Sequence, residues 1–418
     1  MESLFIKGGR RLSGDISIST AKNSLLPILS GCIMSDEYIE IRQCTMYEDV
    51  KTMLEILLDI GCKIEVIDDN IIVDSSSISK YFIKEEFSRK VRSSIFMLGS
   101  LLSRFKQAKV AYPGGCNIGT RPIDLHLKGL RALNVKIEEK HGYIYCDGSN
   151  MKPNIVHLDF PSVGATENIM MASVKLKGRT TIYNCACEPE IEDLQNFLNA
   201  MGAKITGAGT STIVIDGVDK LHGCTYLPYS DRIITGTYLI ACAMAKGSIR
   251  LNNVNPEHNY DLISKLKQAG CRLKISPTTI EIFANKPLKS VPKISTQTYP
   301  GFPTDLQNQI LAMQTISRGV SVITENLFET RFKIVNELTK MGADVTIHKQ
   351  SAIVKGVPNL YGANVIASDL RGGAGLVLAG IVAEGYTTVK DVEHIDRGYL
   401  AIEKDLCKLN VDIKRITD

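Results

Sequence analysis

Alternating apolar and polar residues recur along the chain in pairs of short segments around a polar turn. Each pair predicts a β-hairpin, because successive side chains of a strand point to opposite faces of its sheet. In the first, Ile64 and Val66 and then Ile71 and Val73 alternate with other residues. The pattern recurs at residues 61–75, 134–148, 202–217, 270–284, 342–356 and, as one strand only, 410–416. The starts of these segments are about 70 residues apart.

Helical patterns separate these segments. VKTMLEILLDI (50–60) and IEDLQNFLNAM (191–201) have apolar residues three and four positions apart, which is typical of an amphipathic helix. SLLPILSGCIM, ENIMMASVKL and GLVLAGIVA are apolar nearly all round, which predicts helices buried on every side. Each apolar helix precedes a further short strand, which recurs as EYIEIRQC, QAKVAYPG, GRTTIYNC, GSIRLNNV, GVSVITEN and GYTTVKDV.

One repeat therefore contains two helices and about four strands, and the chain contains six repeats. A repeat of this length buries its apolar face only by packing on its neighbours. We predict an α/β fold with helices inside and sheets outside. Three plus three repeats would give two domains with a cleft between them. A continuous solenoid is the alternative, and the distinctive loop at residues 112–126 argues against it.

Composition restricts the possible functions of the chain less than the repeats restrict its fold. The chain has 418 residues, 44% hydrophobic and 22% charged, with a net charge of +4, which is ordinary for a globular enzyme. No run of lysine and arginine resembles a nucleic-acid arm, so an acidic small molecule is the more natural partner. We expect neither a signal peptide nor a membrane span. Eleven cysteines without framework spacing fit a reducing cytoplasm and do not favour a zinc site.

Several predicted helices begin with a cation, although the partial positive charge of a helix N-terminus disfavours one there. These cations are Lys22, Arg92, Arg121, Arg232, Arg331, Arg371 and Arg397. A single case is explained by pairing with a neighbouring carboxylate, as Arg232 beside Asp231 suggests. Seven cases favour sites in which cation and helix N–H groups hold anions together. PSVGAT (161–166) and DLRGGAG (369–375) fit either such backbone contacts or plain tight loops.

Cys116 is a candidate for chemistry. It lies among glycines in PGGCNIG, five residues before Arg121. Nearby cations and a helix N-terminus lower the pKa of a thiol, and glycines let a loop close over a ligand. We interpret Cys116 as a functional thiol, and the other cysteines as small buried hydrophobic residues.

Three carboxylates are candidates too. Asp305 in FPTD is either a helix cap or a base close to bound substrate. Asp369 with Arg371, and Asp396 with Arg397, are either simple ion pairs or cations that a carboxylate orients toward an anionic ligand. The residues alone do not separate these alternatives.

Seven segments together resemble the UDP-N-acetylglucosamine 1-carboxyvinyltransferases of the enolpyruvyl transferase family. They read PGGCNIGTRPIDLH, DFPSVGATEN, EPEIEDL, GFPTDLQNQ, FETRF, DLRGGAG and HIDRGY, and the resemblance covers nearly the whole chain. It implies two inside-out α/β barrel domains of three repeats each, with the active site in the cleft between them. The implied domains are residues 22–229, which carry the cysteine loop, and residues 1–21 with 230–418.

The resemblance also implies a reaction. Enolpyruvyl passes from phosphoenolpyruvate to the 3′-hydroxyl of UDP-N-acetylglucosamine, and phosphate leaves, by addition and then elimination. The implied enzyme is a cytoplasmic transferase without cofactor or metal and without nucleic-acid or membrane partners. Its reaction is the first committed step of bacterial peptidoglycan synthesis, on which cell shape and cell division depend.

Site residues of the family correspond to positions of this chain. Cys116 is implied as the loop acid or nucleophile, and Asp305 as the residue that handles the 3′-hydroxyl proton. The implied contacts of the phosphoenolpyruvate phosphate are Lys22, Arg121 and Arg397. The other implied substrate-binding residues are Arg331 and Arg371 on the carboxylate side, Asn23 and Leu327 near the sugar, and Arg92, Pro122, Ile123, Asp124, Leu125, Ser162, Val163, Gly164 and Asp369.

The chain departs from the family at Glu48 and Phe160, where many members have lysine. Any cationic contact from these two positions is therefore in doubt. Three rival functions are weaker. The cysteine loop argues against a 5-enolpyruvylshikimate-3-phosphate synthase, and the presence of Cys116, Asp305 and Lys22 argues against a non-catalytic nucleotide-sugar-binding paralogue. Weak net charge and only seven histidines argue against an RNA-end-processing enzyme.

Overall fold

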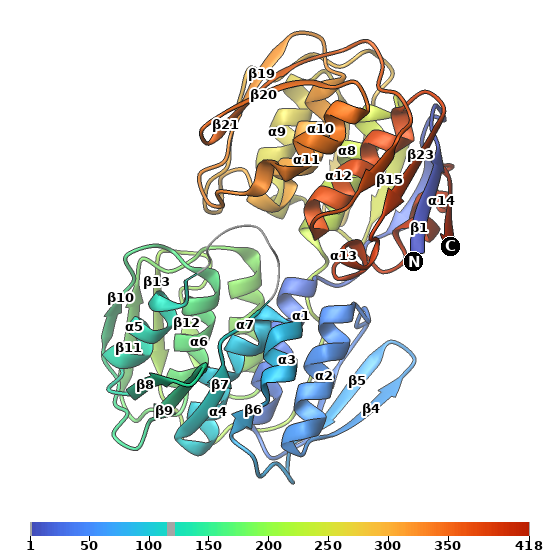
Figure 1. Ribbon diagram of the computed structural model, residues 1–418. Coiled ribbons are helices and arrows are strands. Elements are labelled where there is room, and N and C mark those ends of the chain that lie inside the picture. Colours follow the sequence, from blue (N-terminus) through green and yellow to red (C-terminus); the bar gives the residue numbers. More distant parts are fainter. Residues whose placement is uncertain (1, 115–121, 418) are drawn as a thin grey trace. The chain divides into compact units, whose positions relative to one another are not determined.

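The computed structural model describes residues 2–114 and 122–417, so Cys116 and Arg121 lie outside the described residues (Figure 1). The described chain forms two compact units. The central unit contains residues 20–114 and 122–229, and the terminal unit contains residues 2–19 and 230–417. The implied division into functional domains at residues 21 and 229 stays a prediction.

Each unit contains three four-stranded sheets that share one topology. An antiparallel pair, which is a hairpin in five of the six sheets, has a third strand antiparallel beside it, and a fourth strand lies parallel to that third strand at the sheet edge. The sheets of the central unit have the orders β14–β3–β5–β4, β6–β7–β9–β8 and β10–β11–β13–β12. Those of the terminal unit have the orders β2–β15–β17–β16, β18–β19–β21–β20 and β22–β23–β1–β24. Six such sheets confirm the six predicted repeats.

The strands have the following bounds. In the central unit they are β3 (Ile39–Ile41), β4 (Lys63–Ile67), β5 (Asn70–Asp74), β6 (Phe82–Ile83), β7 (Gln107–Ala111), β8 (Lys136–Lys140), β9 (Tyr143–Asp147), β10 (Ile155–His157), β11 (Arg179–Tyr183), β12 (Lys204–Thr206), β13 (Thr212–Asp216) and β14 (Cys224–Tyr226). In the terminal unit they are β1 (Glu2–Lys7), β2 (Ser13–Ser17), β15 (Ser248–Asn252), β16 (Arg272–Ser276), β17 (Thr279–Phe283), β18 (Lys293–Ser295), β19 (Val320–Thr324), β20 (Asp344–His348), β21 (Ser351–Lys355), β22 (Asn364–Ile366), β23 (Tyr386–Lys390) and β24 (Asp412–Thr417).

The hairpins follow the alternation of the sequence. In β17, Ile280 and Ile282 are fully buried, while Glu281 between them is half-buried on the other face. Five predicted hairpins form as expected. The sixth segment supplies only β24, and the N-terminal strand β1 takes the place of its partner between β23 and β24. Leu4 and Ile6 of β1 are fully buried there, so the first and last strands complete one sheet.

Six helices are buried inside the units and surrounded by these sheets (Figure 1). They are α1 (Lys22–Gly31), α4 (Met97–Phe105) and α6 (Val163–Ser173) in the central unit, and α8 (Arg232–Met244), α10 (Gln307–Thr315) and α12 (Leu370–Val382) in the terminal unit. Every residue of α12 from Leu370 to Ile381 is buried. In the terminal unit each of the three helices packs on the other two, which excludes a solenoid there. The predicted inside-out α/β barrel architecture is confirmed.

Amphipathic helices cover the outside of this core. The longer ones are α2 (Glu48–Ile60), α5 (Asp124–Ala132), α7 (Pro189–Ala200), α9 (Tyr260–Gln268), α11 (Ile334–Lys340) and α14 (Ile402–Lys408), and the shorter ones are α3 (Glu85–Lys90) and α13 (Glu393–Asp396). In α2, Val50, Met53, Leu54 and Leu57 are buried at helical spacing, as the sequence predicts. In the chain outside residues 1, 115–121 and 418, no helix reaches the length and apolarity of a membrane span.

One buried carboxyl group in α6 carries a prediction about stability. Glu167 is fully buried, and neither carboxyl oxygen has a hydrogen-bond partner among the described residues. Burial, with smaller contributions from the charges of Glu190 and Glu188, raises its pKa well above the ordinary value. The folded protein therefore holds this proton more tightly than the unfolded chain, and stability is lost as the pH rises from the ordinary glutamate range through the folded pKa.

We expect Glu167→Gln to remove this loss. Its melting temperature should exceed that of the wild type at pH 8, by about 2–4 °C for each 1 kcal/mol recovered. At pH 3, which is below the ordinary glutamate pKa, the wild-type group is protonated in both states and the two proteins should melt together. Calorimetry at both pH values tests this, with Glu65→Gln on the exposed face of β4 as a control. A lower melting temperature for Glu167→Gln at pH 8 would contradict the interpretation.

Candidate functional site

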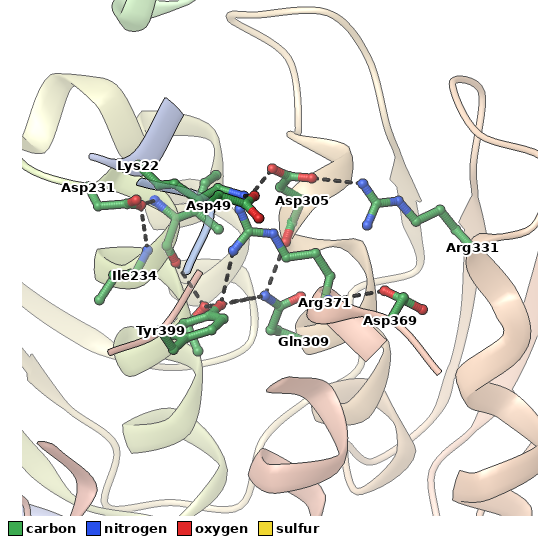
Figure 2. Close-up of polar contacts among 12 residues, drawn as sticks. Lys22, Asp49, Asp231, Ile234, Asp305, Gln309, Arg331, Asp369, Arg371 and Tyr399 are labelled. Carbon is green, nitrogen blue, oxygen red and sulfur yellow. Dashed lines mark hydrogen bonds and ion pairs between the residues drawn. The ribbon is translucent and has the colours of Figure 1, made fainter. Parts of the chain in front are cut away.

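Asp305 of the terminal unit lies between two buried guanidinium groups. It belongs to a single 3₁₀ turn, Thr304–Leu306, which leads into α10. One carboxylate oxygen accepts a hydrogen bond from Arg331 Nη2 at 2.7 Å, and the other accepts one from Arg371 Nη2 at 3.0 Å. The arginine side chains are 3% and 5% exposed, and that of Asp305 is 26% exposed. Figure 2 shows the three side chains converging, and Asp305 is the most exposed of the three.

Glu325 fixes the loops around this carboxylate. It is buried at the end of β19 and accepts a hydrogen bond from Thr304 Oγ1 at 2.8 Å. The backbone N–H groups of Leu327 and Phe328 donate to its other oxygen at 2.8 and 3.1 Å. The turn that carries Asp305 and the loop that carries Leu327 are therefore tied to one buried side chain. Leu327, implied near the sugar, is half-buried in that loop.

Arg371 is held from two directions at the start of α12. Asp369 caps this helix, and the backbone N–H groups of Arg371 and Gly372 donate to it at 3.0 Å each. The Arg371 guanidinium reaches Asp305 and, at 3.4 Å, the hydroxyl of Tyr399. Burial alone would lower the pKa of Arg371, but the charges of Asp305 and its other neighbours outweigh burial and raise it. The carboxylate of Asp369 therefore caps α12 and orients Arg371.

Tyr399 holds this cluster through the hydrogen bonds of its buried hydroxyl group. Its hydroxyl lies 2.8 Å from Thr237 Oγ1 of α8 and 3.3 Å from Gln309 Nε2 of α10 (Figure 2). Gln309 also donates to the backbone oxygen of Asp305 at 3.0 Å. Because Tyr399 is fully buried, these bonds hold the three buried helices and Arg371 in one arrangement.

Arg397 has a different setting from the one predicted. It directly follows α13 and occupies the C-terminal cap of that short helix, while the next helix, α14, begins only at Ile402. The prediction that Arg397 opens a helix is therefore wrong. The preceding residue, Asp396, accepts two hydrogen bonds from Arg415 at 2.7 and 2.8 Å. Asp396 thus anchors the turn of Arg397 to strand β24.

Arg415 was not predicted as a site residue. Besides Asp396, it contacts Glu403 at 3.2 Å and Glu2 at 2.7 Å. The hydrogen bond to Asp396, aided by those to the two glutamates, raises its pKa above the ordinary value. This one guanidinium connects β1, α13, α14 and β24, so it positions the segment that presents Arg397.

In the central unit, Lys22 and Asp49 form a buried ion pair. Lys22 is the first residue of α1, Asp49 lies in the first turn of α2, and Lys22 Nζ is 3.1 Å from Asp49 Oδ2. The side chains are 11% and 7% exposed. Tyr47 donates to the backbone oxygen of Thr20 at 3.0 Å, which ties the two helix starts together. Asn23 is half-buried beside Lys22.

A second group in the central unit gathers around the start of α6. Ser162 caps α6 by accepting from the N–H of Ala165 at 3.4 Å. A Cβ on Gly164 would lie 2.9 Å from the ring of His126, so only glycine lets α6 approach α5 this closely. Asn168 holds that ring at 2.8 Å. The residues implied for the nucleotide sugar that begin these elements are Pro122, Ile123, Asp124 and Leu125 before and in α5, Ser162, Val163 and Gly164 at α6, and Arg92 at a short 3₁₀ helix that packs on α6.

The remaining candidates have simpler surroundings. Arg232 is the first residue of α8, and its guanidinium lies over the ring of Tyr299. Asp231 caps this helix by accepting hydrogen bonds from two backbone N–H groups at 2.8 and 2.9 Å. Glu48 forms an exposed ion pair with Lys51 at 2.6 Å. Phe160 is 46% exposed. Neither departure from the family therefore disturbs the packing of the helix starts.

Most cysteines of the described chain are buried. Burial raises the pKa of Cys242 to about 12 and that of Cys271 to about 11, and it raises the pKa of Cys32 well above the ordinary value. Such thiols are poor nucleophiles near neutral pH. Within residues 2–114 and 122–417, no cluster of three or more histidine, cysteine, aspartate or glutamate side chains has the geometry to hold a metal ion.

Four partners of the site escaped prediction: Asp49, Glu325, Tyr399 and Arg415. Asp49 and Tyr399 lie in or beside segments that the resemblance already singled out, so they carried a weak signal. Glu325 and Arg415 lie on or next to strands that look structural. Arg415 contacts residues 12 to 413 positions away, and Glu325 contacts Thr304 21 positions away, which no local pattern reveals.

Comparisons with known proteins point to one family. The family profile described as EPSP synthase (3-phosphoshikimate 1-carboxyvinyltransferase) matches residues 6–406. "UDP-N-acetylglucosamine 1-carboxyvinyltransferase 2" of Caldanaerobacter subterraneus subsp. tengcongensis is 51% identical over 98% of this chain and 99% of its own. "UDP-N-acetylglucosamine 1-carboxyvinyltransferase 1" of Clostridium acetobutylicum is 45% identical over the full length of both.

Two solved structures share the fold. The enolpyruvyl transferase NikO from Streptomyces tendae has a TM-score of 0.89 at 23% identity and covers 100% of this chain and 99% of its own. EPSP synthase from Acinetobacter baumannii has a TM-score of 0.77 at 18% identity and covers all of both chains. Together with the sequence relatives, these likenesses show that the chain belongs to the enolpyruvyl transferase family, which contains EPSP synthase and the UDP-N-acetylglucosamine 1-carboxyvinyltransferases.

Proposed function

We propose that the chain transfers enolpyruvyl from phosphoenolpyruvate to the 3′-hydroxyl of UDP-N-acetylglucosamine and releases phosphate. The observation that carries this proposal is the partly exposed carboxylate of Asp305, held by two buried guanidinium groups. Such a group suits proton abstraction from a hydroxyl next to an anionic co-substrate. Relatives up to 51% identical over nearly the whole chain, named for this activity, support the choice of acceptor.

The proposed chemistry has two steps. In the addition, the 3′-oxygen bonds to C2 of phosphoenolpyruvate, Asp305 takes the hydroxyl proton, and the methylene carbon gains a proton from an acid, which we assign to Cys116. In the elimination, the C2–O bond to phosphate breaks and a methyl proton is lost, which restores the vinyl group. We assign Lys22, Arg121 and Arg397 to the phosphate, and Arg331 and Arg371 to the carboxylate.

The buried arginines suit that role. A bidentate guanidinium recognises a carboxylate by geometry as well as charge. Arg371 and Arg331 each already donate to Asp305. If they also bind the carboxylate of phosphoenolpyruvate, the substrate carboxylate and Asp305 share donors, and Asp305 lies next to the reacting carbon. We assign the nucleotide sugar to Arg92, Arg121–Leu125 and Ser162–Gly164, and its sugar ring to Asn23 and Leu327.

A phosphate-release assay tests the function. We expect release only when phosphoenolpyruvate and UDP-N-acetylglucosamine are both present. With shikimate 3-phosphate as acceptor, release should stay at background. If shikimate 3-phosphate served and the nucleotide sugar did not, the chain would be a 5-enolpyruvylshikimate-3-phosphate synthase instead. Binding of the nucleotide sugar without any release would indicate a non-catalytic paralogue.

The proposal extends to the place of the reaction in the cell. We propose a cytoplasmic enzyme at the first committed step of peptidoglycan synthesis, where it would serve growth, cell shape and division. Depletion of the protein should lower the pool of enolpyruvyl nucleotide sugar before any later precursor falls. An unchanged pool after depletion would count against this role.

We expect fosfomycin to inactivate the enzyme by alkylating Cys116. The thiolate opens the epoxide, a C–S bond forms as a C–O bond breaks, and the new alkoxide takes up a proton. Cys116→Ser should abolish the mass increase and the inactivation. Cys116→Asp should retain activity, because a carboxyl group can transfer the proton, and should resist the drug. Intact mass and residual activity after incubation measure both effects, with Cys407→Ser, an exposed thiol on α14, as the control. Full sensitivity of Cys116→Ser would refute the assignment.

A further inference from the structure

The terminal unit contains a cavity of about 490 Å³ at the C-terminal ends of its buried helices. Met244 at the end of α8, Ile316 just after α10 and Val382 at the end of α12 all line it. We call it the helix-end pocket. Its volume lies within the usual range for small-molecule sites. Neither the proposed reaction nor the implied family residues involve it.

Backbone hydrogen bonds build the walls of the helix-end pocket. The N–H of Gly9 donates to Ile381 O at 3.0 Å, and the N–H of Val357 donates to Thr315 O at 2.7 Å. The N–H of Arg318 donates to Leu288 O at 2.9 Å. Two loops are thereby fastened to the ends of α12 and α10, and a third is fastened to the segment that follows α10, so the cavity has a fixed frame.

The chemistry of the lining is one-sided. Among the described residues, three cations line the pocket, Arg10, Lys246 and Arg318, and no aspartate or glutamate does. Arg10 forms an ion pair with Asp412 at 2.9 Å. Lys246 and Arg318 are exposed and have no ion-pair or side-chain hydrogen-bond partner in the described part of the chain. The apolar part of the lining includes Met244, Leu288, Ile316, Val357, Leu360 and Ile381.

The central unit shows what cations do when they only complement helix ends. There Lys175 Nζ donates to Met34 O at 2.6 Å, and Arg104 Nη1 donates to Ile33 O at 2.8 Å. These two side chains fold onto carbonyl groups of the 3₁₀ turn Cys32–Met34, which directly follows α1, and Arg104 is only 12% exposed. Lys246 and Arg318 make no such bonds in the described chain. Neutralising a helix dipole therefore explains the cations of the central unit better than those of the helix-end pocket.

We propose that the helix-end pocket binds a phosphate monoester with an apolar or aromatic body. Two cations without partners match the two negative charges of the ester, and charge-assisted hydrogen bonds from both would hold it. The apolar lining would cover its organic body. This inference does not depend on the proposed transferase function.

The pocket is distinct from the Asp305 cluster. Arg371 lies in the first turn of α12, and the pocket lies at the other end of the same 13-residue helix. At 1.5 Å per residue, Arg371 and Val382 are about 16 Å apart along that helix. Binding at one site therefore need not block the other.

Isothermal titration of the full chain with 1-naphthyl phosphate tests the proposal, with saturating UDP-N-acetylglucosamine present. We expect saturable binding that weakens by about tenfold for each cation removed in Lys246→Ala and Arg318→Ala. Arg318→Lys, which keeps the charge, should lose less. Lys177→Ala, a 91% exposed lysine of the central unit, should bind like the wild type. Inorganic phosphate should bind more weakly than the naphthyl ester, because it lacks the apolar body.

The outcomes separate cleanly. A selective loss in the Lys246 and Arg318 variants, with unchanged melting temperatures, supports the site. No saturable heat from the wild type up to about 10 mM ester would overturn it. So would equal affinity of the wild type and the double variant, because the ester would then bind elsewhere. If inorganic phosphate bound as tightly as the ester, the claim of an apolar body would fall.

Discussion

We expect Asp305→Asn to lower kcat by about 100- to 10,000-fold, the range typical for loss of a general base. The amide nearly matches the carboxylate in shape, but it does not take up the hydroxyl proton. It also removes the one negative charge that Arg331 and Arg371 share, at 2.7 and 3.0 Å. The affinity for UDP-N-acetylglucosamine should change much less than kcat, because the lost interaction belongs to the reacting hydroxyl.

Steady-state phosphate release, with nucleotide-sugar binding by titration, measures the two effects separately. Asp344→Asn, an exposed aspartate at the start of β20, makes the same chemical change away from the cluster and should leave kcat unchanged. A kcat for Asp305→Asn within about threefold of the wild type would show that another group takes the proton. Melting temperatures of both variants check that the arginines still pack.

We expect Lys22→Gln to lower kcat/KM for phosphoenolpyruvate by about 10- to 150-fold. That range corresponds to loss of a charge-assisted hydrogen bond of about 1.5–3 kcal/mol. The change also leaves the buried carboxylate of Asp49 without the ammonium group that lies 3.1 Å away. KM for phosphoenolpyruvate should rise more than KM for UDP-N-acetylglucosamine, since Lys22 is assigned to the phosphate.

Two further variants make this result specific. Asp49→Asn keeps the ammonium group and should have a smaller effect than Lys22→Gln. Lys51→Gln removes an exposed lysine of α2 that pairs with Glu48, and it should have no measurable effect. If Lys22→Gln and Lys51→Gln lost equal kcat/KM for phosphoenolpyruvate, the loss would come from the lower net charge of the protein. The proposed contact between Lys22 and the phosphate would then be wrong.

The repeat pattern predicted most of the architecture. Alternation in β17 and helical spacing in α2 are local signals, and each element formed where its pattern lies. The apolar segment GLVLAGIVA indicated burial on all sides, and α12 is buried accordingly. Period, polarity and length are enough to predict such elements. A strand or helix with one buried face has apolar residues at regular spacing along a short stretch of sequence, so the signal is local.

The contacts of the site were less accessible from sequence. Asp305 is joined to partners 26 and 66 residues away, and Asp396 to one 19 residues away. The nearby pair Asp396 and Arg397 suggested a local ion pair, but nothing in the sequence indicated that the Asp396 carboxylate accepts hydrogen bonds from Arg415. Arg397 was expected at a helix start because the following residues look helical, yet a turn separates it from α14. Only the resemblance could single out such positions before the structure.

Strand β1 has a consequence for how the protein is made. Its residues leave the ribosome long before the strands on either side of it, β23 and β24. Residues 8–385 are synthesised in between, which takes roughly 20–80 s at about 5–20 residues per second. The central unit is contiguous and can fold during that time, while the nascent N-terminus still lacks its sheet. This sheet is therefore completed only after β23 and β24 have been made, and chains that stop before them leave an unpaired strand edge for chaperones and proteases to recognise.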